Sequence, residues 1–174
     1  MSKINEEEIY HGRIFDVVRE VHRMPDGREA RFEIIKHPGG AAALPVLADG
    51  RLLLIRQFRP VTEEFIYEIP AGRLEPEEDA GQCIARELEE EIGYTPGAVE
   101  SLGFVWSSVG FCSEKIHLFL ARDLQPAQLA LEPDEFIEPE ILTLAEALEM
   151  IASGRINDAK TQIALLRYAQ TRKE

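Results

Sequence analysis

The sequence predicts an α+β fold in which a mixed β-sheet is sandwiched between helices, an α/β/α arrangement, with antiparallel strands at the N-terminus. Short apolar runs dominate the first third of the chain, one long helical pattern follows, and two more helical patterns close the chain. This order of elements is typical of a sheet with helices on both faces. The 174 residues contain no repeat and no low-complexity linker, so we expect one domain over residues 1–174.

The N-terminal strands are expected to form two hairpins. Residues 10–37 contain two apolar runs joined by the turn signal Pro25-Asp26-Gly27. Residues 41–47 and 51–58 form a second expected hairpin about Asp49-Gly50, a dipeptide that favours a tight turn.

A central helix is expected over residues 77–92, where Ile84, Leu88 and Ile92 recur at four-residue spacing and Gly93 provides a C-terminal stop. Two later strands are expected over residues 100–106 and 115–121, with Trp106 in the core. Two closing helices are expected over residues 143–154 and from Asp158 onward.

The charge of the chain restricts its partners. The net charge is -13 and the sequence pI is about 4.8, so the chain would repel a nucleic-acid backbone, and we expect no nucleic-acid partner. No apolar run is long enough to span a membrane, and the acidic N-terminus has no leader-like apolar stretch. We therefore expect a cytoplasmic protein without a membrane partner. A phosphate-containing substrate would need cations to mediate its encounter with this chain.

Three carboxylates on the central helix provide a place for such cations. Glu87, Glu90 and Glu91 are three and four residues apart, so they project from one helical face, next to the face that carries Leu88. Like charges at this spacing, near a helix C-terminus, destabilise the helix unless a cation is bound. Magnesium prefers a few carboxylate oxygens together with water and substrate phosphates. The alternative is a solvated acidic face on an acidic protein.

The residues around these carboxylates resemble the signature of the Nudix hydrolase family. Every fixed position of that signature is matched by Gly72, by Glu78 after five intervening residues, and by the run from Arg86 to Gly93 after seven more. Tyr94 is a mild departure at the last, bulky apolar position. Nine matching positions over residues 72–94 make a specific motif. The resemblance implies the Nudix fold and a magnesium-dependent hydrolase of nucleoside diphosphate derivatives, with manganese as a possible substitute.

The resemblance also assigns roles within this segment. It implies that Glu87 and Glu91 are the principal metal ligands, with Glu90 binding or bridging a second ion as part of the catalytic group. The backbone carbonyl of Ala71 corresponds to a frequent further ligand. The supporting residues, which shape the loop and orient the helix, are Gly72, Glu78 and Arg86.

Outside this segment the chain resembles the ADP-ribose pyrophosphatase branch of the family. The resemblance rests on residues 56–60, 67–72 and 158–161. It implies that Arg59, Arg56 and Glu68 contact phosphate or ribose; alternatively, Arg56 is a surface residue that balances nearby glutamates, and Glu68 pairs with an arginine.

One position departs from this branch. Val109 stands where the branch usually carries a proline, which leaves GDP-mannose and other sugar nucleotides or dinucleotides as alternative substrates.

The general base and the base contacts rest on the same resemblance. The branch places a catalytic glutamate on a loop after the core strands, which indicates Glu135, with Glu114 as the second candidate and simple solvent exposure as the alternative. Residues 1–40 are expected to exchange across a homodimer, where Phe32 and Glu33 would contact adenine. For Phe32, core packing is the competing interpretation.

Three functions follow from these observations. The first is hydrolysis of ADP-ribose, a nucleoside diphosphate sugar, to AMP and ribose 5-phosphate. The second is the same chemistry on GDP-mannose or another nucleotide. The third is a non-catalytic, nucleotide-sensing domain, which the complete set of carboxylates at Glu87, Glu90 and Glu91 disfavours.

Overall fold

The protein divides into two compact units. The computed structural model describes residues 2–131, 133 and 135–172. The first unit comprises Met1–Gly39 and Trp106–Lys115, and the second comprises Gly40–Val105 and Ile116–Glu174. Each unit is described by itself below. In the part of the chain that the structure describes, no helix is long and apolar enough to cross a membrane.

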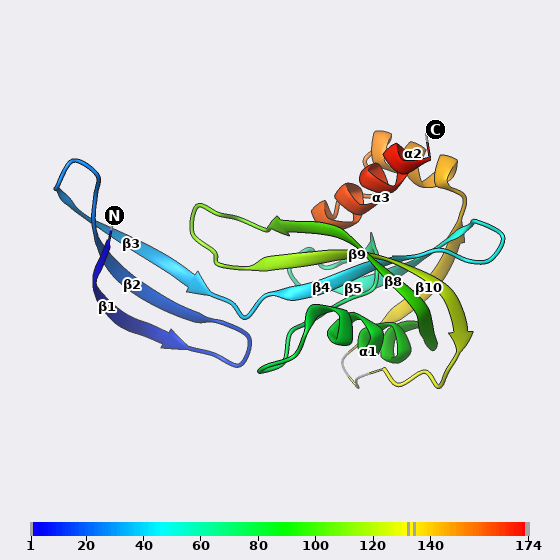
Figure 1. Ribbon diagram of the computed structural model, residues 1–174, viewed down its shortest axis with the longest axis horizontal. Coiled ribbons are helices and arrows are strands. Elements are labelled where there is room, and N and C mark those ends of the chain that lie inside the picture. Colours follow the sequence, from blue (N-terminus) through cyan, green and yellow to red (C-terminus); the bar gives the residue numbers. More distant parts are fainter. Residues whose placement is uncertain (1, 132, 134, 173–174) are drawn as a thin grey trace. The chain divides into compact units, whose positions relative to one another are not determined.

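The first unit contains a three-stranded antiparallel sheet, drawn in blue in Figure 1. Its strands run in chain order as β1 (Ser2–His11), β2 (Asp16–Arg23) and β3 (Glu29–Lys36). The turn expected at Pro25-Asp26-Gly27 joins β2 to β3, and Gly27 adopts a positive φ of 84° that suits glycine there. Most of β1 lies outside the expected range because its polar sequence gives no strand pattern.

This sheet has few apolar side chains in its interior. Val18 is the buried hydrophobic residue that it contributes, whereas Glu20 is only 3% exposed. Lys36 Nζ and His22 Nε2 each lie 2.5 Å from a Glu20 carboxylate oxygen, and the Lys36 hydrogen bond is the main cause that lowers the pKa of Glu20 to about 2. Trp106 is 49% exposed, so its predicted place in the core is wrong.

The second unit contains two sheets. One is antiparallel, in the order β10 (Ile137–Leu142), β5 (Leu52–Arg59) and β6 (Glu64–Glu68). The other is mixed, in the order β7 (Ala71–Arg73), β4 (Gly40–Pro45), β9 (Lys115–Pro126) and β8 (Tyr94–Trp106), with β4 parallel to β9.

The hairpin predicted from 41–47 and 51–58 is only partly correct. The turn at Asp49-Gly50 forms, with Gly50 at a φ of 85°. Beyond one bridge between Val46 and Leu52, however, β4 and β5 belong to different sheets. The reason is that β7 and β9 already pair with the two edges of β4.

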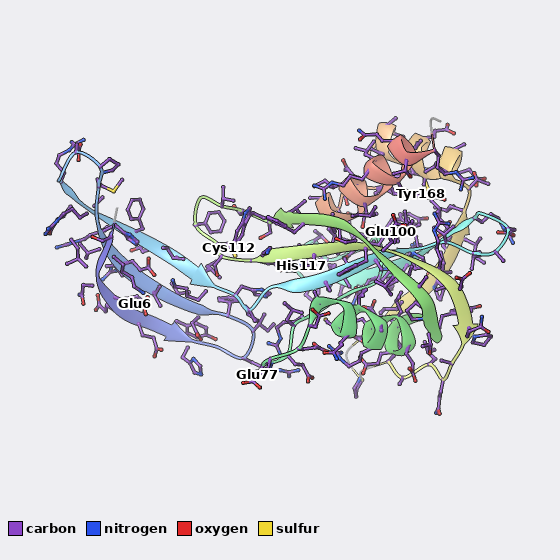
Figure 2. All side chains as sticks on the ribbon, in the orientation of Figure 1. Glu6, Glu77, Glu100, Cys112, His117 and Tyr168 are labelled. Atoms are coloured by element: carbon purple, nitrogen blue, oxygen red, sulfur yellow. The ribbon has the colours of Figure 1, made fainter. Side chains whose placement is uncertain are left out.

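Helices cover this unit from two sides, as predicted. Figure 1 shows α1 (Ala80–Ile92) on one side of the strands and α2 (Leu144–Ala152) with α3 (Ala159–Thr171) on the other. Figure 2 shows the same division, with Glu77 on the α1 side and Tyr168 on the α3 side. Along β5, Leu53 and Ile55 pack with the core beneath α1, whereas Leu52 and Leu54 pack with the core beneath α2 and α3. Alternate residues of β5 therefore face opposite helical layers.

The ends of α1 depend on particular side chains. Asp79 caps the first turn, accepting a hydrogen bond from the Gly81 amide at 2.8 Å, and Gln82 completes a capping box. The helix consequently starts three residues later than the predicted start at residue 77. Gly93 ends it with a φ of 68°, as predicted, while Thr143 and Asp158 cap the two closing helices.

Candidate active site

Helix α1 carries two acidic side chains inside the protein. Glu87 is 9% exposed and Glu91 is 2% exposed. They lie one turn apart on a helix whose apolar side chains, among them Ile84 and Leu88, pack in the core beneath it. That packing holds the two carboxylates in place although burying their charge is unfavourable.

Glu91 is the more buried of the two acids. The backbone amide of Ala71 in β7 donates a hydrogen bond to Glu91 Oε2 at 3.0 Å. Burial is the main cause that raises the pKa of Glu91 well above its usual value, and the negative charge of Glu87 raises it further. The Ala71 amide and the positive charge of Arg59 oppose this rise. Without a cation, the ionised form of Glu91 is unfavourable here.

Glu87 depends on the missing side chain of Gly72. A Cβ atom at Gly72 would lie 1.7 Å from Glu87 Oε1, so no other amino acid fits without displacing the carboxylate. Burial also raises the pKa of Glu87, although the adjacent Arg86 partly opposes it. The supporting role predicted for Gly72 therefore has a direct steric basis.

Arg86 connects three carboxylates around the helix. Its Nε and Nη2 atoms lie 3.1 and 3.2 Å from the two oxygens of Glu78, in the loop before α1. Its Nη1 atom donates to Glu87 Oε1 at 2.8 Å and to Glu90 Oε2 at 2.9 Å. Arg86 thus ties the loop to the helix, consistent with the orienting role predicted for it and for Glu78.

The donor set fits a hard divalent cation. Glu87 and Glu91 offer buried carboxylate oxygens whose raised pKa values reflect burial and repulsion by nearby acids, which a bound cation would relieve. Glu90, with a side chain 39% exposed, bonds to Arg86. Among the described residues, no three Asp, Glu, His or Cys side chains already form a metal cluster.

The two candidates for the general base lie in different units. Glu135, in the second unit, is half-buried, and its negative charge raises the pKa of both Glu87 and Glu91. Its neighbours Glu132 and Asp134 lie outside the described residues. Glu114 belongs to the first unit, where its carboxylate lies 3.7 Å from His37 Nδ1.

The two predicted substrate arginines lie on opposite faces of β5. Arg59 forms a two-pronged pair with Glu68, from Nε to Oε1 at 2.6 Å and from Nη2 to Oε2 at 2.9 Å. Its charge also opposes the rise in the pKa of Glu91. Arg56 points to the other face, where it pairs with Glu138 at 3.0 Å and lies over the rings of Phe65 and Tyr67. Of these two arginines, Arg59 is therefore the one whose charge acts on Glu91.

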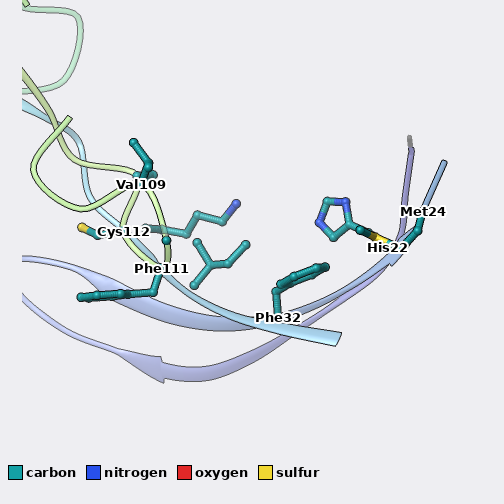
Figure 3. A pocket seen from close by; sticks show the side chains of 10 residues that line it. His22, Met24, Phe32, Val109, Phe111 and Cys112 are labelled. Atoms are coloured by element: carbon teal, nitrogen blue, oxygen red, sulfur yellow. The ribbon is translucent and has the colours of Figure 1, made fainter. Parts of the chain in front are cut away.

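Phe32 and Glu33 also point in opposite directions. Phe32 lies edge-on to His22, with ring centroids 5.7 Å apart, and lines a cavity of about 400 Å³ within the first unit. Figure 3 shows Phe32 in this cavity with Val109 and Phe111 of the 106–115 segment. Glu33 pairs with Arg19 across the strands at 3.3 Å. Because adjacent strand residues alternate, the two cannot flank one base from the same side.

Sequence reasoning missed two residues of this site. Lys160, at the start of α3, bonds to Glu68 and lies 3.2 Å from Asp158, so both join the pair made by Arg59. The run Asp158-Ala159-Lys160-Thr161 was a signal for the helix start and part of the family resemblance, but it gave no link to Glu68, which lies far earlier in the chain. No local pattern connects the two segments.

Comparison with known proteins finds a matching family model and several similar chains. The family model of the NUDIX domain matches residues 36–163. The chain is 39% identical to an ADP-ribose pyrophosphatase of Bacillus subtilis (strain 168) over 93% of this chain and 89% of that protein. It is also 39% identical to a methanol dehydrogenase activator of Bacillus methanolicus, with the same coverage.

One further match covers less of the chain, and another has lower sequence identity. A GDP-mannose pyrophosphatase of Yersinia enterocolitica is 40% identical over 70% of this chain and 68% of that protein. The crystal structure of an ADP compounds hydrolase superposes with a TM-score of 0.84, at 23% identity, over 98% of this chain and 92% of that one. This last likeness concerns the fold.

The buried Glu91 carboxylate leads to a prediction about stability. Because its pKa is raised above 4.5 in the folded state, the cation-free protein should lose stability as the pH rises from about 4.5 through that raised value. Glu91→Gln removes this loss and keeps an acceptor for the Ala71 amide. We expect the variant to be more stable than the parent at pH 8 by about 1–3 kcal/mol, the scale of an uncompensated buried group.

Thermal unfolding in chelator at pH 5 and pH 8 measures this difference, with Glu89→Gln, an exposed acid of the same helix, as the control. Added Mg²⁺ should stabilise the parent more than Glu91→Gln. A variant that is less stable than the parent at pH 8 would contradict the prediction.

Proposed function

The chain belongs to the Nudix family, whose members hydrolyse pyrophosphate bonds with divalent metals, and on this basis we propose that it cleaves nucleoside diphosphate sugars with Mg²⁺, ADP-ribose first among them. Hydrolysis would yield AMP and ribose 5-phosphate. The observation that carries the chemistry is the buried pair Glu87 and Glu91 with the cationic Arg59 close by. The observation that carries the substrate is the similarity over nearly the whole chain to an ADP-ribose pyrophosphatase.

Each residue of the site has a role in this proposal. Glu87, Glu91 and the carbonyl of Ala71 would hold magnesium, with Glu90 at a second ion. The bound metal would supply charge neutralisation of the diphosphate and a more acidic water. Arg59 would bind a phosphate oxygen and so fix the diphosphate.

Proton transfer is assigned to Glu135. It would accept the proton of the water whose oxygen attacks phosphorus, while the bond from that phosphorus to the bridging oxygen breaks. Its charge acts on both buried acids, which supports this choice over Glu114. Arg56 would then contribute outside the reacting centre, on the face where it meets Glu138.

A second candidate substrate is GDP-mannose. Val109 departs from the ADP-ribose branch, and this residue lines the same cavity as Phe32, the proposed base contact. A GDP-mannose pyrophosphatase is 40% identical to this chain over 70% of the chain. The diphosphate chemistry is the same for both substrates, so the choice depends on how the base and the sugar are recognised.

Product formation from a panel of nucleotides tests the function. ADP-ribose, GDP-mannose, ADP-glucose, NADH and diadenosine polyphosphates are incubated with Mg²⁺ or with chelator, and products are separated by chromatography. We expect the fastest release of AMP from ADP-ribose, a dependence on Mg²⁺, and a loss of more than about 100-fold in Glu91→Gln, since even outer partners of a metal contribute 10–100-fold.

A preference for GDP-mannose would replace the first substrate and retain the chemistry. Absence of turnover for every compound in Mg²⁺ would overturn the substrate class.

The general base is tested by paired substitutions. Glu135→Gln should lower kcat by about 10²–10⁴-fold with little change in KM, because it removes the proton acceptor and leaves binding intact. Glu114→Gln is the matched control and should stay close to the parent. If Glu114→Gln loses kcat and Glu135→Gln does not, the two assignments are reversed.

The homodimer is part of the same proposal. Within the described residues, the first unit buries Val18 as its hydrophobic side chain, while Ile4, Ile9 and Tyr10 of β1 are each more than 40% exposed. A three-stranded sheet with so little interior needs further cover to be stable. A second copy of the chain would provide that cover and, by resemblance, bring Phe32 to adenine.

Light scattering after gel filtration measures the assembly. We expect a mass of twice 19.6 kDa for the parent. Ile9→Glu should shift the protein towards the single-chain mass, because a charge replaces an apolar contact. Leu166→Glu is the matched control, since both parent side chains are 46% exposed and Leu166 belongs to the second unit. A parent that elutes as a single chain at micromolar concentration would contradict the dimer.

A further inference from the structure

One buried carboxylate in the second unit holds two cationic side chains. Glu68, at the end of β6, is 1% exposed. Arg59 reaches it from β5 with two hydrogen bonds, at 2.6 and 2.9 Å. From the first turn of α3, Lys160 donates to Glu68 Oε2, the oxygen that also accepts from Arg59 Nη2. Burial alone would raise the pKa of Glu68, but the two cations outweigh it and hold that pKa below its usual value.

Lys160 is itself fixed by the start of α3. Its side chain is 11% exposed and lies 3.2 Å from Asp158. Asp158 caps the helix by accepting from the Thr161 amide at 2.9 Å and from the Thr161 hydroxyl at 2.6 Å. The Thr161 hydroxyl oxygen in turn accepts from the Ile69 amide, next to Glu68, at 2.9 Å. These hydrogen bonds fix the start of α3, and with it the position from which Lys160 approaches Glu68.

These contacts form a row of alternating charges, Asp158, Lys160, Glu68 and Arg59, whose cationic end acts on Glu91. The Nε and Nη2 edge of Arg59 belongs to the pair with Glu68, and Nη1 takes no part in that pair. The arginine side chain is still 38% exposed, so a ligand can reach it. Such a fork has two edges, and a carboxylate held on one edge orients the other.

Loss of Lys160 would change the surroundings of Arg59. Glu68 would keep Arg59 as its single cationic partner in this row, and a buried carboxylate with too little positive charge around it is strongly unfavourable. The guanidinium would then be held more tightly by Glu68 and would be less available to a diphosphate. Its position would also shift, because the anchor on the α3 side is gone.

We propose that Lys160 is a positioning residue: through Glu68 it sets the orientation and the available charge of Arg59 at the diphosphate. This rests on the proposed function, in which Arg59 binds a phosphate oxygen. It gives the C-terminal helix a part in the reaction without contact between Lys160 and the substrate.

A merely structural Lys160, which only fastens α3 to β6, makes a different prediction. In that case Lys160→Met would reduce the amount of folded protein. Its effect on the activity of the folded fraction would be the same with Arg59 present or replaced. A double-mutant cycle separates the two roles, because residues that act through one another are not additive.

The cycle compares the parent, Lys160→Met, Arg59→Gln and the double variant, all at the same folded concentration. We expect Lys160→Met to lower kcat/KM by about 10–100-fold in the parent, the usual effect of displacing a group that positions the reacting atoms. In the Arg59→Gln background we expect the same substitution to cost less than about threefold. Lys160→Arg, which keeps the charge, should recover part of the activity.

Arg172→Met is the matched control, because it removes one positive charge from the far end of α3, where Arg172 bonds to Tyr168. It should leave kcat/KM unchanged. Should Lys160→Met fail to fold, Lys160→Gln, which keeps a donor towards Glu68, takes its place in the cycle.

A second readout does not depend on turnover. Titration calorimetry with ADP and Mg²⁺ should show weaker binding for Lys160→Met than for Arg172→Met, and no additional weakening in the Arg59→Gln background. If the parent hydrolyses none of the panel, the proposed function fails, and ADP binding still decides the role of Lys160. The inference is overturned if Lys160→Met has the same effect in both backgrounds, or no effect in the parent.

Discussion

The site depends on the burial of two acidic side chains against β7. Glu91 lies beneath the backbone amide of Ala71, and Glu87 occupies the space that a side chain at Gly72 would fill. Neither carboxylate would stay there by its own preference, since burial raises the pKa of both. The apolar face of α1 and the capping of that helix by Asp79 supply the stabilisation that keeps them in place.

Two arginines stand beside these acids, and each has a carboxylate of its own. Arg86 is held by Glu78, and Arg59 is held by Glu68. An arginine without such a partner would be expected to turn towards the buried acids and compete with a metal for them. Arg86 does reach Glu87 and Glu90 with one nitrogen, yet two other nitrogens stay with Glu78. Site geometry therefore depends on paired charges as much as on apolar packing.

Local patterns predicted most of what this site needs, and long-range contacts account for what they missed. The 72–94 motif, the stop at Gly93 and the caps at Thr143 and Asp158 were all visible in the sequence, because each acts over a few residues. Strands β1, β6 and β10 were missed, because their polar or mixed residues give no clean alternation. The pairing of Glu68 with Lys160 spans 92 residues, and no spacing rule reaches that far.

The division of the chain into two units bears on how substrates are distinguished. In the proposed function, the buried acids and Arg59 of the second unit address a diphosphate, which ADP-ribose and GDP-mannose have in common. What differs between these molecules is the base and the sugar, and the proposed base contact, Phe32, belongs to the first unit together with Val109. If Phe32 recognises the base as proposed, changes in the first unit would alter the preferred nucleotide while Glu87 and Glu91 remain unchanged. On this proposal, relatives named for different nucleotides would retain similarity to one chain because they share the diphosphate chemistry.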